Sequence, residues 1–243
     1  MPTPRKMRCQ VERVIDHGDH VYTVDLKPDR PVPVFRPGQF LHLTIDEYDP
    51  SGFWPESRVF SIASSPQERD QLVISYSVKG VYTTRMEREL VPGKFVWVKL
   101  PYGDFVVDGA RDVVLIAGGT GITAFQAFIE GLSPDHPHKV VLLYGARRSE
   151  LLLGLEVIEA KVRDCRKFGA FLFAEDRRAE HASHIEERTI RAGRISRDVL
   201  KDCVMSDACT YYLAGPPLMV SALGNELAQQ GVPGSKIIVD AWE

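Results

Sequence analysis

The stretch VVLIAGGTGITAF, Val113 to Phe125, constrains the fold most, because an apolar run leads directly into a glycine-rich turn and then into residues that can open a helix. Gly119, Gly121 and Ala124 fit the G-x-G-x-x-G/A spacing of a dinucleotide-binding turn. A tight turn needs residues without a Cβ, and a pyrophosphate can approach only where side chains are absent. The N–H groups that open the helix then attract the anion. The alternative is a glycine-rich strand-to-helix turn that binds no ligand.

Composition limits the class of protein. The chain has 243 residues, 44% of them hydrophobic and 26% charged, which is ordinary for a globular protein of one or two domains. The net charge of −3 gives no general attraction to nucleic acid or anionic lipid. No apolar stretch approaches the roughly 20 residues of a membrane span, and the N-terminus MPTPRKMRCQ lacks the apolar core of a signal peptide. We therefore expect a soluble, cytoplasmic protein with no membrane span and no nucleic-acid partner.

The cysteines and histidines do not predict a metal or iron–sulfur site. The spacing of His181 and His184 could serve a metal, but both lie in the highly charged segment AEDRRAEHASHIEER without a supporting motif, which favours a solvated surface. The cysteines are scattered, form no CxxC pair and match no iron–sulfur run: Cys9, Cys165, Cys203 and Cys209. We expect no metal ligands in this chain.

The character of the chain changes near residue 110, between Asp108 and Arg111. Before it, β-type runs separated by Pro and Gly indicate an antiparallel barrel or sandwich: residues 11–17, 21–27, 40–45, 58–64, 71–78 and 94–100. After it, predicted strands alternate with predicted helices, which is the pattern of a parallel sheet covered by helices. The strands are at 112–118, 139–146, 168–175, 208–215 and 236–242, and the helices are near 123–132, 151–165 and 217–230. We therefore predict two domains, residues 1–109 and 110–243.

The N-terminal half contains a second set of ligand-like residues. In the tetrapeptide RVFS, strand alternation puts Arg58 and Phe60 on one face, and Val59 and Ser61 on the other. A cation beside a flat ring suits a ligand that has both a phosphate and an aromatic ring system. The alternative is a barrel strand with an exposed arginine.

Gly80 precedes hydroxyl residues at a predicted helix start, where Thr83 or Thr84 leads into RMERELV. Backbone N–H groups at such a start can hold a phosphate. An ordinary helix cap is the alternative.

Together these motifs resemble the ferredoxin–NADP reductase superfamily of flavoenzymes over nearly the whole chain. The matching segments, in chain order, are similar to the family's PGQ turn, RxYS flavin motif, GxxS/T pyrophosphate motif, barrel-closing segment and two nicotinamide-nucleotide loops: residues 37–40, 58–61, 80–83, 101–105, 118–123 and 214–217. The resemblance implies an N-terminal antiparallel β-barrel that binds flavin and a C-terminal α/β parallel-sheet domain that binds NAD(P)H.

The resemblance also implies roles for single residues. Arg58 would pair with a flavin phosphate, Phe60 would stack on the flavin, and Ser61 would hydrogen-bond flavin N5, the atom that receives hydride. The implied flavin-binding residues are Arg58, Val59, Phe60, Ser61, Ser75, Tyr76, Ser77, Gly80, Val81 and Thr83. The implied nucleotide-binding residues are Gly119, Thr120, Gly121, Ile122, Thr123, Arg147, Gly215, Pro216 and Pro217.

Two positions depart from the family pattern, and the C-terminus carries an acid–aromatic pair. Phe60 replaces the usual tyrosine, which keeps the stacking and loses a hydroxyl hydrogen bond. Ala214 replaces a cysteine that many relatives carry near the hydride path. Asp240 precedes Trp242 by two residues, a spacing similar to the acid and terminal tyrosine of plant-type members. By resemblance, the catalytic candidates are Ser61, Asp240 and Trp242. Trp242 would also bind the flavin, by covering it until nicotinamide displaces the indole ring. The alternative is that Trp242 packs at the end of the last strand.

Charges near the predicted coenzyme adenosine conflict. Cations there would favour a 2′-phosphate: Arg147, Arg148 and Arg194. Glu175 and Asp176 would accept a hydrogen bond from a free ribose 2′-OH, although Arg177 and Arg178 would neutralise them. The balance favours NADH over NADPH. For the flavin we expect FAD, bound non-covalently, with FMN as the alternative.

We therefore expect an NAD(P)H-dependent flavin oxidoreductase that passes electrons to a separate ferredoxin, flavodoxin or oxygenase component, or to a small-molecule acceptor. The alternative is a non-catalytic, regulatory flavin- and nucleotide-binding subunit of a larger complex. The sequence leaves the acceptor and the oligomeric state open.

Overall fold

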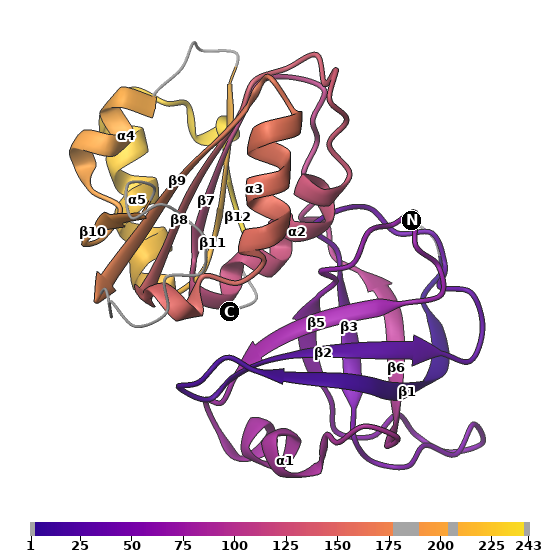
Figure 1. Cartoon of the computed structure of the whole chain (residues 1–243). Coiled ribbons are helices and arrows are strands. Elements are labelled where there is room, and N and C mark those ends of the chain that lie inside the picture. Colours follow the sequence, from indigo (N-terminus) through magenta and orange to yellow (C-terminus); the bar gives the residue numbers. More distant parts are fainter. Residues whose placement is uncertain (1–2, 177–189, 204–208, 241–243) are drawn as a thin grey trace. The chain divides into compact units, whose positions relative to one another are not determined.

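The computed structural model describes residues 3–176, 190–203 and 209–240 (Figure 1). The chain divides into two compact units, Met1–Val106 with Gln126–Phe128, and Val107–Phe125 with Ile129–Glu243. We call the first the barrel unit and the second the sheet unit.

Six antiparallel strands among the described residues form the barrel unit, in the order β4-β3-β6-β1-β2-β5. Their bounds, with the one helix of this unit, are β1 Arg5–Asp16, β2 Val21–Pro28, β3 Phe40–Thr44, β4 Arg58–Ser61, β5 Leu72–Ser77, α1 Val81–Glu89 and β6 Phe95–Tyr102. The first and last strands of this order approach each other just beyond β4, where the N–H of Ala63 donates to the carbonyl of Val73 at 2.9 Å. The sheet is therefore a nearly closed barrel.

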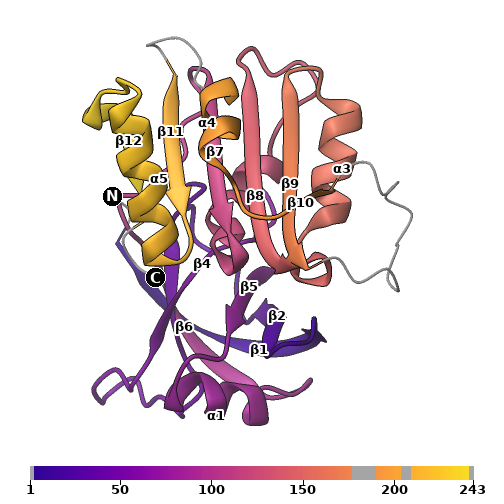
Figure 2. The ribbon, with the colours of Figure 1, turned by 90° about the vertical axis from the view of Figure 1, so that its left-hand side faces the viewer.

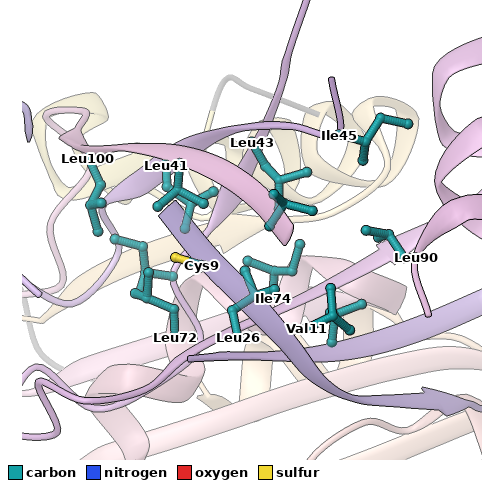
Figure 3. Close-up of a cluster of buried hydrophobic side chains, with 14 of the residues drawn as sticks. Cys9, Val11, Leu26, Leu41, Leu43, Ile45, Leu72, Ile74, Leu90 and Leu100 are labelled. Carbon is teal, nitrogen blue, oxygen red and sulfur yellow. The ribbon is translucent and has the colours of Figure 1, made fainter. Parts of the chain in front are cut away.

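Alternation of apolar residues explains why these segments form strands. In β1, Met7, Cys9 and Val11 are each about 1% exposed, whereas the residues between them face outward or are half-buried. Leu41 and Leu43 of β3 contribute to the same core, and Figure 3 shows their side chains converging with those of the other strands. A period of two places every second side chain inside the barrel.

The sheet unit contains six parallel strands among the described residues, in the order β10-β9-β8-β7-β11-β12. Its elements are β7 Val113–Gly118, η1 Gly119–Ile122, α2 Thr123–Glu130, β8 Val140–Arg148, η2 Ser149–Leu151, α3 Leu155–Asp164, β9 Phe168–Asp176, β10 Ile190–Ala192, α4 Arg197–Cys203, β11 Thr210–Ala214, α5 Pro217–Gln229, η4 Gly234–Lys236 and β12 Ile237–Val239. Helices α4 and α5 cover one face of the sheet, and α2 and α3 the other (Figures 1 and 2). Sheets of this kind place ligands at the carboxyl ends of their strands.

The predicted fold class is confirmed, with corrections to single elements. Strand β1 begins at Arg5, six residues before the predicted run, and β10 and α4 were not predicted. Strands β10 and β12, at the two edges of the parallel sheet, have only three residues each. In the part of the chain that the structure describes, no helix is both long enough and apolar enough to cross a membrane.

Candidate functional site

Arg58 begins strand β4, and its side chain is 43% exposed yet fixed by three neighbours. The guanidinium donates to Oε1 of Glu56 at 2.7 Å and to the carbonyl of Ser57 at 2.9 Å. It also lies 4.4 Å from the centroid of the Tyr82 ring, within the range of a cation–π contact. Strand β4 therefore begins with a guanidinium that is fixed in position and accessible to solvent.

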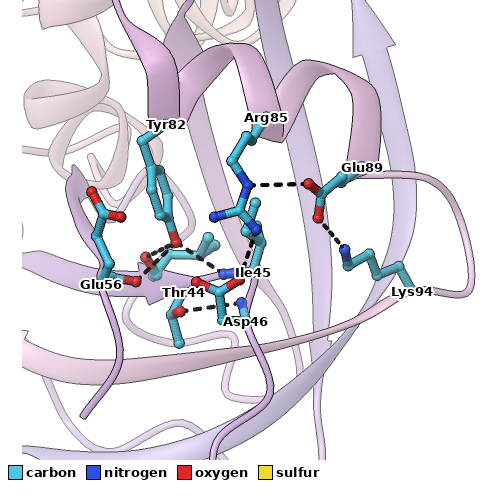
Figure 4. A network of polar contacts seen from close by, with 9 residues as sticks. Thr44, Ile45, Asp46, Glu56, Tyr82, Arg85, Glu89 and Lys94 are labelled. Atoms are coloured by element: carbon cyan, nitrogen blue, oxygen red, sulfur yellow. Dashed lines mark hydrogen bonds and ion pairs between the residues drawn. The ribbon is translucent and has the colours of Figure 1, made fainter.

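Tyr82, in the first turn of α1, connects this cation to the rest of the barrel unit. Its ring is 2% exposed, and its hydroxyl donates to the carbonyl of Glu56 at 3.1 Å and accepts from the N–H of Ile45 at 3.0 Å. Farther along α1, Arg85 pairs with Asp46 at 2.7 Å (Figure 4). These bonds fix the start of α1 relative to the segment that carries Arg58.

The N-terminus of α1 is capped by a side chain but leaves its first amides open. The Thr83 hydroxyl accepts from the N–H groups of Lys79 and Gly80, at 2.9 and 3.1 Å, and donates to the Gly80 carbonyl at 3.0 Å. The first-turn N–H groups have no acceptor within the helix. A Cβ placed on Gly80 would meet no atom within 4 Å, and Val81 is 84% exposed. An anion can therefore reach these amides, while the Thr83 side chain is already engaged as a cap.

The other residues of β4, Val59, Phe60 and Ser61, are all partly buried. Phe60 lies opposite Leu41 in register, is partly buried and packs against the core, whereas Ser61 lies opposite Phe40 and is partly exposed. Val59 shares the face of Ser61. The ring of Phe60 thus contributes to the barrel core, and Ser61 is partly accessible.

Strand β5 carries three further predicted flavin residues. The ring of Tyr76 lies 6.1 Å from that of Phe60, and the buried Tyr76 hydroxyl has no hydrogen-bond partner among the described residues. Burial raises the pKa of this phenol, so it stays protonated and can donate. Ser75 already bonds Thr23 at 2.7 Å, and Ser77 is half-buried. An unpaired buried hydroxyl is unusual and fits a missing ligand group.

In the sheet unit, the two predicted nucleotide-binding loops, residues 118–123 and 214–217, approach each other closely through backbone atoms. A Cβ on Gly121 would lie 2.5 Å from backbone atoms of Ala214 and Gly215, and a Cβ on Gly215 would lie 2.8 Å from the carbonyl oxygen of Gly118. Gly119 is different, because it has φ +53° and a Cβ there would meet nothing within 4 Å. The open surface suited to a phosphate is thus at Gly119, and Gly121 serves the closure of the two loops.

The remaining loop residues divide into buried and exposed groups. Ile122 is fully buried, and Thr123 is buried with its hydroxyl donating to the carbonyl of Thr120 at 2.8 Å. Their side chains hold the turn. Pro216 and Pro217 are exposed after the buried Gly215.

Asp240 follows the edge strand β12, and its N–H donates to the carbonyl of Leu213 at 2.8 Å. Asp240 lines a hollow of about 370 Å³ together with Gly215 and Pro217. Two predicted parts of the site are thus neighbours. Several other predicted residues lie outside the described residues: Trp242, Arg177, Arg178, His181 and His184.

The charges expected at the coenzyme adenosine are partly paired. Arg194 bonds Glu175 at 2.9 Å, and this carboxylate raises the pKa of the guanidinium. Arg148 lies beside Asp176 in the register of β8 and β9. Arg147 is exposed and has no ion pair or hydrogen bond with the described residues. Within this group Arg147 is therefore the cation most available to a 2′-phosphate.

Comparison with known proteins identifies the same architecture. Residues 115–224 match the oxidoreductase NAD-binding domain. The flavohemoprotein of Bacillus subtilis is 28% identical over 212 residues, which cover 85% of this chain and 51% of that protein. The reductase component of phenol 2-monooxygenase from a Pseudomonas species is 29% identical over 157 residues, 63% of this chain and 42% of that protein. The chain spans about half the length of the curated relatives it matches.

A solved structure covers the full extent of the fold. The flavohem-like FAD/NAD binding domain of nitric oxide dioxygenase from Vibrio cholerae has a TM-score of 0.76 and 20% sequence identity, with 96% of this chain and 97% of that chain covered. The predicted resemblance to FAD- and NAD(P)H-binding reductases is confirmed. The roles of single site residues stay predictions.

Proposed function

We propose that this chain, which resembles ferredoxin reductase-like proteins that bind FAD and NAD(P)H, is an NAD(P)H-dependent flavin oxidoreductase that passes electrons to a separate acceptor. In this proposal, residues 1–109 bind FAD and residues 110–243 bind the nicotinamide coenzyme.

One observation carries the proposal: each unit has its own place for a phosphate. In the barrel unit, the exposed guanidinium of Arg58 lies over Tyr82 in the first turn of α1, whose amides are open. In the sheet unit, Gly119 leaves free space at the carboxyl end of β7, before the start of α2. A helix start and a bare glycine turn are both suited to a pyrophosphate. A subunit that only docks to a partner needs neither.

The residues of the barrel unit fit FAD. Arg58 would hold a phosphate by charge, the α1 amides would hold the pyrophosphate, and Tyr76 has a hydroxyl free to donate to a ligand. Ser61 is partly exposed in β4. When bound, FAD supplies the ring that accepts a hydride, and the chain contributes binding, orientation and hydrogen bonds.

In the sheet unit, the Gly119 turn would bind the coenzyme pyrophosphate, and Pro216 and Pro217 would border its nicotinamide. Asp240 lines a hollow together with Gly215 and Pro217, and we propose that its carboxyl group acts near that end of the coenzyme. Exclusion of water and fixed placement of the reacting groups account for most of the rate enhancement in such a transfer. Trp242 stays a candidate for shielding the flavin.

For the acceptor we propose the protein component of an oxygenase. Relatives of this chain include the reductase component of phenol 2-monooxygenase and the electron transfer component of 2-halobenzoate 1,2-dioxygenase. A ferredoxin, a flavodoxin and small-molecule acceptors are the other candidates. We also propose NADH as the preferred coenzyme, because Glu175 and Asp176 are the last two residues of β9, where a ribose 2′-OH would lie. A cytoplasmic location stays a prediction.

The test is anaerobic reduction of the FAD-loaded protein. Addition of NADH should bleach the visible flavin absorption, and subsequent addition of an acceptor should restore it. A panel of ferredoxin, flavodoxin, oxygenase components and ferric chelates then ranks the acceptors by turnover. A protein that binds FAD and NADH but shows no bleaching would be a binding subunit rather than a reductase.

A further inference from the structure

Glu56 and Arg58 form an ion pair within the segment that leads into β4. Oε1 of Glu56 accepts from the Arg58 guanidinium at 2.7 Å, and the two side chains are 59% and 43% exposed. Both are therefore open to solvent, and to any ligand that approaches the guanidinium.

The side chain and the backbone of Glu56 have separate tasks. Its carbonyl accepts from the buried hydroxyl of Tyr82 at 3.1 Å and so helps fix the start of α1. Its carboxylate contacts only Arg58 among the described residues. Removal of the carboxylate charge therefore leaves the bond that supports the fold in place.

The carboxylate changes what Arg58 can offer an anion. A guanidinium beside a carboxylate at 2.7 Å has little net charge to present, and one of its N–H groups is already occupied. A phosphate that binds Arg58 must displace Glu56 or share the guanidinium with it, and the two anions repel each other when they share it. Arg58 does not depend on Glu56 for its position, because it also bonds the Ser57 carbonyl and lies over Tyr82.

We propose that Glu56 is a built-in competitor of the flavin phosphate for Arg58, and that it sets how tightly this chain retains FAD. The proposal rests on the proposed function, specifically on the phosphate-binding role of Arg58. In this role Glu56 acts through Arg58 and lowers the affinity for the cofactor, whereas the flavin-binding residues increase it.

The test compares Glu56→Gln with a matched control, Glu47→Gln, in apo-protein titrated with FAD and with riboflavin. Glu47 belongs to the same segment between β3 and β4, is exposed and has no ion pair or hydrogen bond with the described residues. Riboflavin has the flavin ring but no phosphate. Loss of one exposed ion pair and of the repulsion between the two anions should tighten FAD binding about three- to tenfold.

The expected pattern is tighter FAD binding in Glu56→Gln, unchanged FAD binding in Glu47→Gln, and unchanged riboflavin binding in both. The gain should shrink as salt rises, because the ions are exposed. The gain in FAD affinity from Glu56→Gln should vanish in an Arg58→Ala background, because the guanidinium for which the carboxylate and the phosphate compete is then absent.

Unchanged or weaker FAD binding in Glu56→Gln would overturn the proposal, provided that Arg58→Ala alone still weakens FAD. If Arg58→Ala leaves FAD binding intact, the failure lies instead in the proposed role of Arg58. Equal tightening of riboflavin would also reject the competition, because it would place the effect at the ring.

Discussion

The contrast between Gly119 and Gly121 gives the most direct test of how the sheet unit is built. Both belong to the glycine-rich turn, yet a methyl group meets open space at Gly119 and the backbone of Ala214 and Gly215 at Gly121. We therefore expect Gly121→Ala to act mainly on stability and Gly119→Ala mainly on coenzyme binding.

The distances set the magnitude. At Gly121 the new Cβ would lie 2.5 Å from three backbone atoms, whereas ordinary contacts begin at 3.4 Å, and no flexible side chain is there to move aside. Overpacking against fixed neighbours costs about 1–3 kcal/mol, which corresponds to a fall in Tm of roughly 2–12 °C for a protein of this size. At Gly119 the cost is the positive φ alone, about 1–2 kcal/mol, and the methyl occupies the space proposed for the pyrophosphate.

Thermal unfolding and NADH titration of both variants provide the assay. Gly169→Ala is the matched control, because a Cβ at Gly169 also meets nothing within 4 Å and its φ is not positive. That variant should keep the wild-type Tm and coenzyme affinity. Gly119→Ala should raise the Kd for NADH at least tenfold, with a loss of Tm of roughly 2–8 °C from the positive φ, whereas Gly121→Ala should lower the Tm and leave the Kd for NADH within a few-fold of wild type. A Gly121→Ala protein with unchanged Tm, or a Gly119→Ala protein with unchanged NADH affinity, would refute this division of roles.

Three further predictions concern charged side chains. Arg58→Ala should weaken FAD binding by about 1.5–3 kcal/mol, because a charge-assisted phosphate contact is lost; flavin titration with wild-type-like retention would remove Arg58 from the site. Arg147→Ala should raise the KM for NADPH more than that for NADH, because only NADPH has a 2′-phosphate, and an equal effect on both would exclude this contact. In the barrel unit, Nδ1 of His20 lies 2.7 Å from Glu87, whose hydrogen bond and charge raise the pKa of His20, while the bond from His20 lowers the pKa of Glu87. The pair therefore stabilises the folded state most between the unfolded-state pKa values of about 4.5 for Glu87 and 6.5 for His20. Its contribution falls as the pH rises through the raised His20 pKa, and also as the pH drops through the lowered Glu87 pKa. Denaturant unfolding of His20→Gln across pH should show this window, and a stability difference from wild type that does not depend on pH would contradict it.

Sequence patterns predicted the fold class because both units repeat a simple period. The apolar alternation of the barrel strands and the buried runs of the parallel strands are local signals. Strand β1 was placed too late because Arg5, Lys6 and Arg8 hide the alternation of Met7 and Cys9, whose burial depends on the strands on either side. Strand β10 was missed since three residues are too few to show a period.

The sequence motifs predicted which segments form the site, but they predicted only part of what each residue does there. A glycine spacing does not tell which glycine faces a ligand and which faces backbone, because that depends on Ala214, which is distant in sequence. The cap at Thr83 is a local signal that the sequence offered as an alternative. Tyr82 and Glu56 were missed, since their roles arise only when α1 packs beside the segment before β4.

The short edges of the parallel sheet bear on how this protein behaves at high concentration. Among the described residues, strands β10 and β12 have three residues each, so another chain that paired with either of them could form few ladder hydrogen bonds. The barrel ends in β4 and β5, and the bond from Ala63 to Val73 joins the chain there. Native copies are thus poor templates for strand addition. Aggregates that form under stress should arise from opened molecules, and their amount should follow the unfolded fraction rather than the total concentration of folded protein.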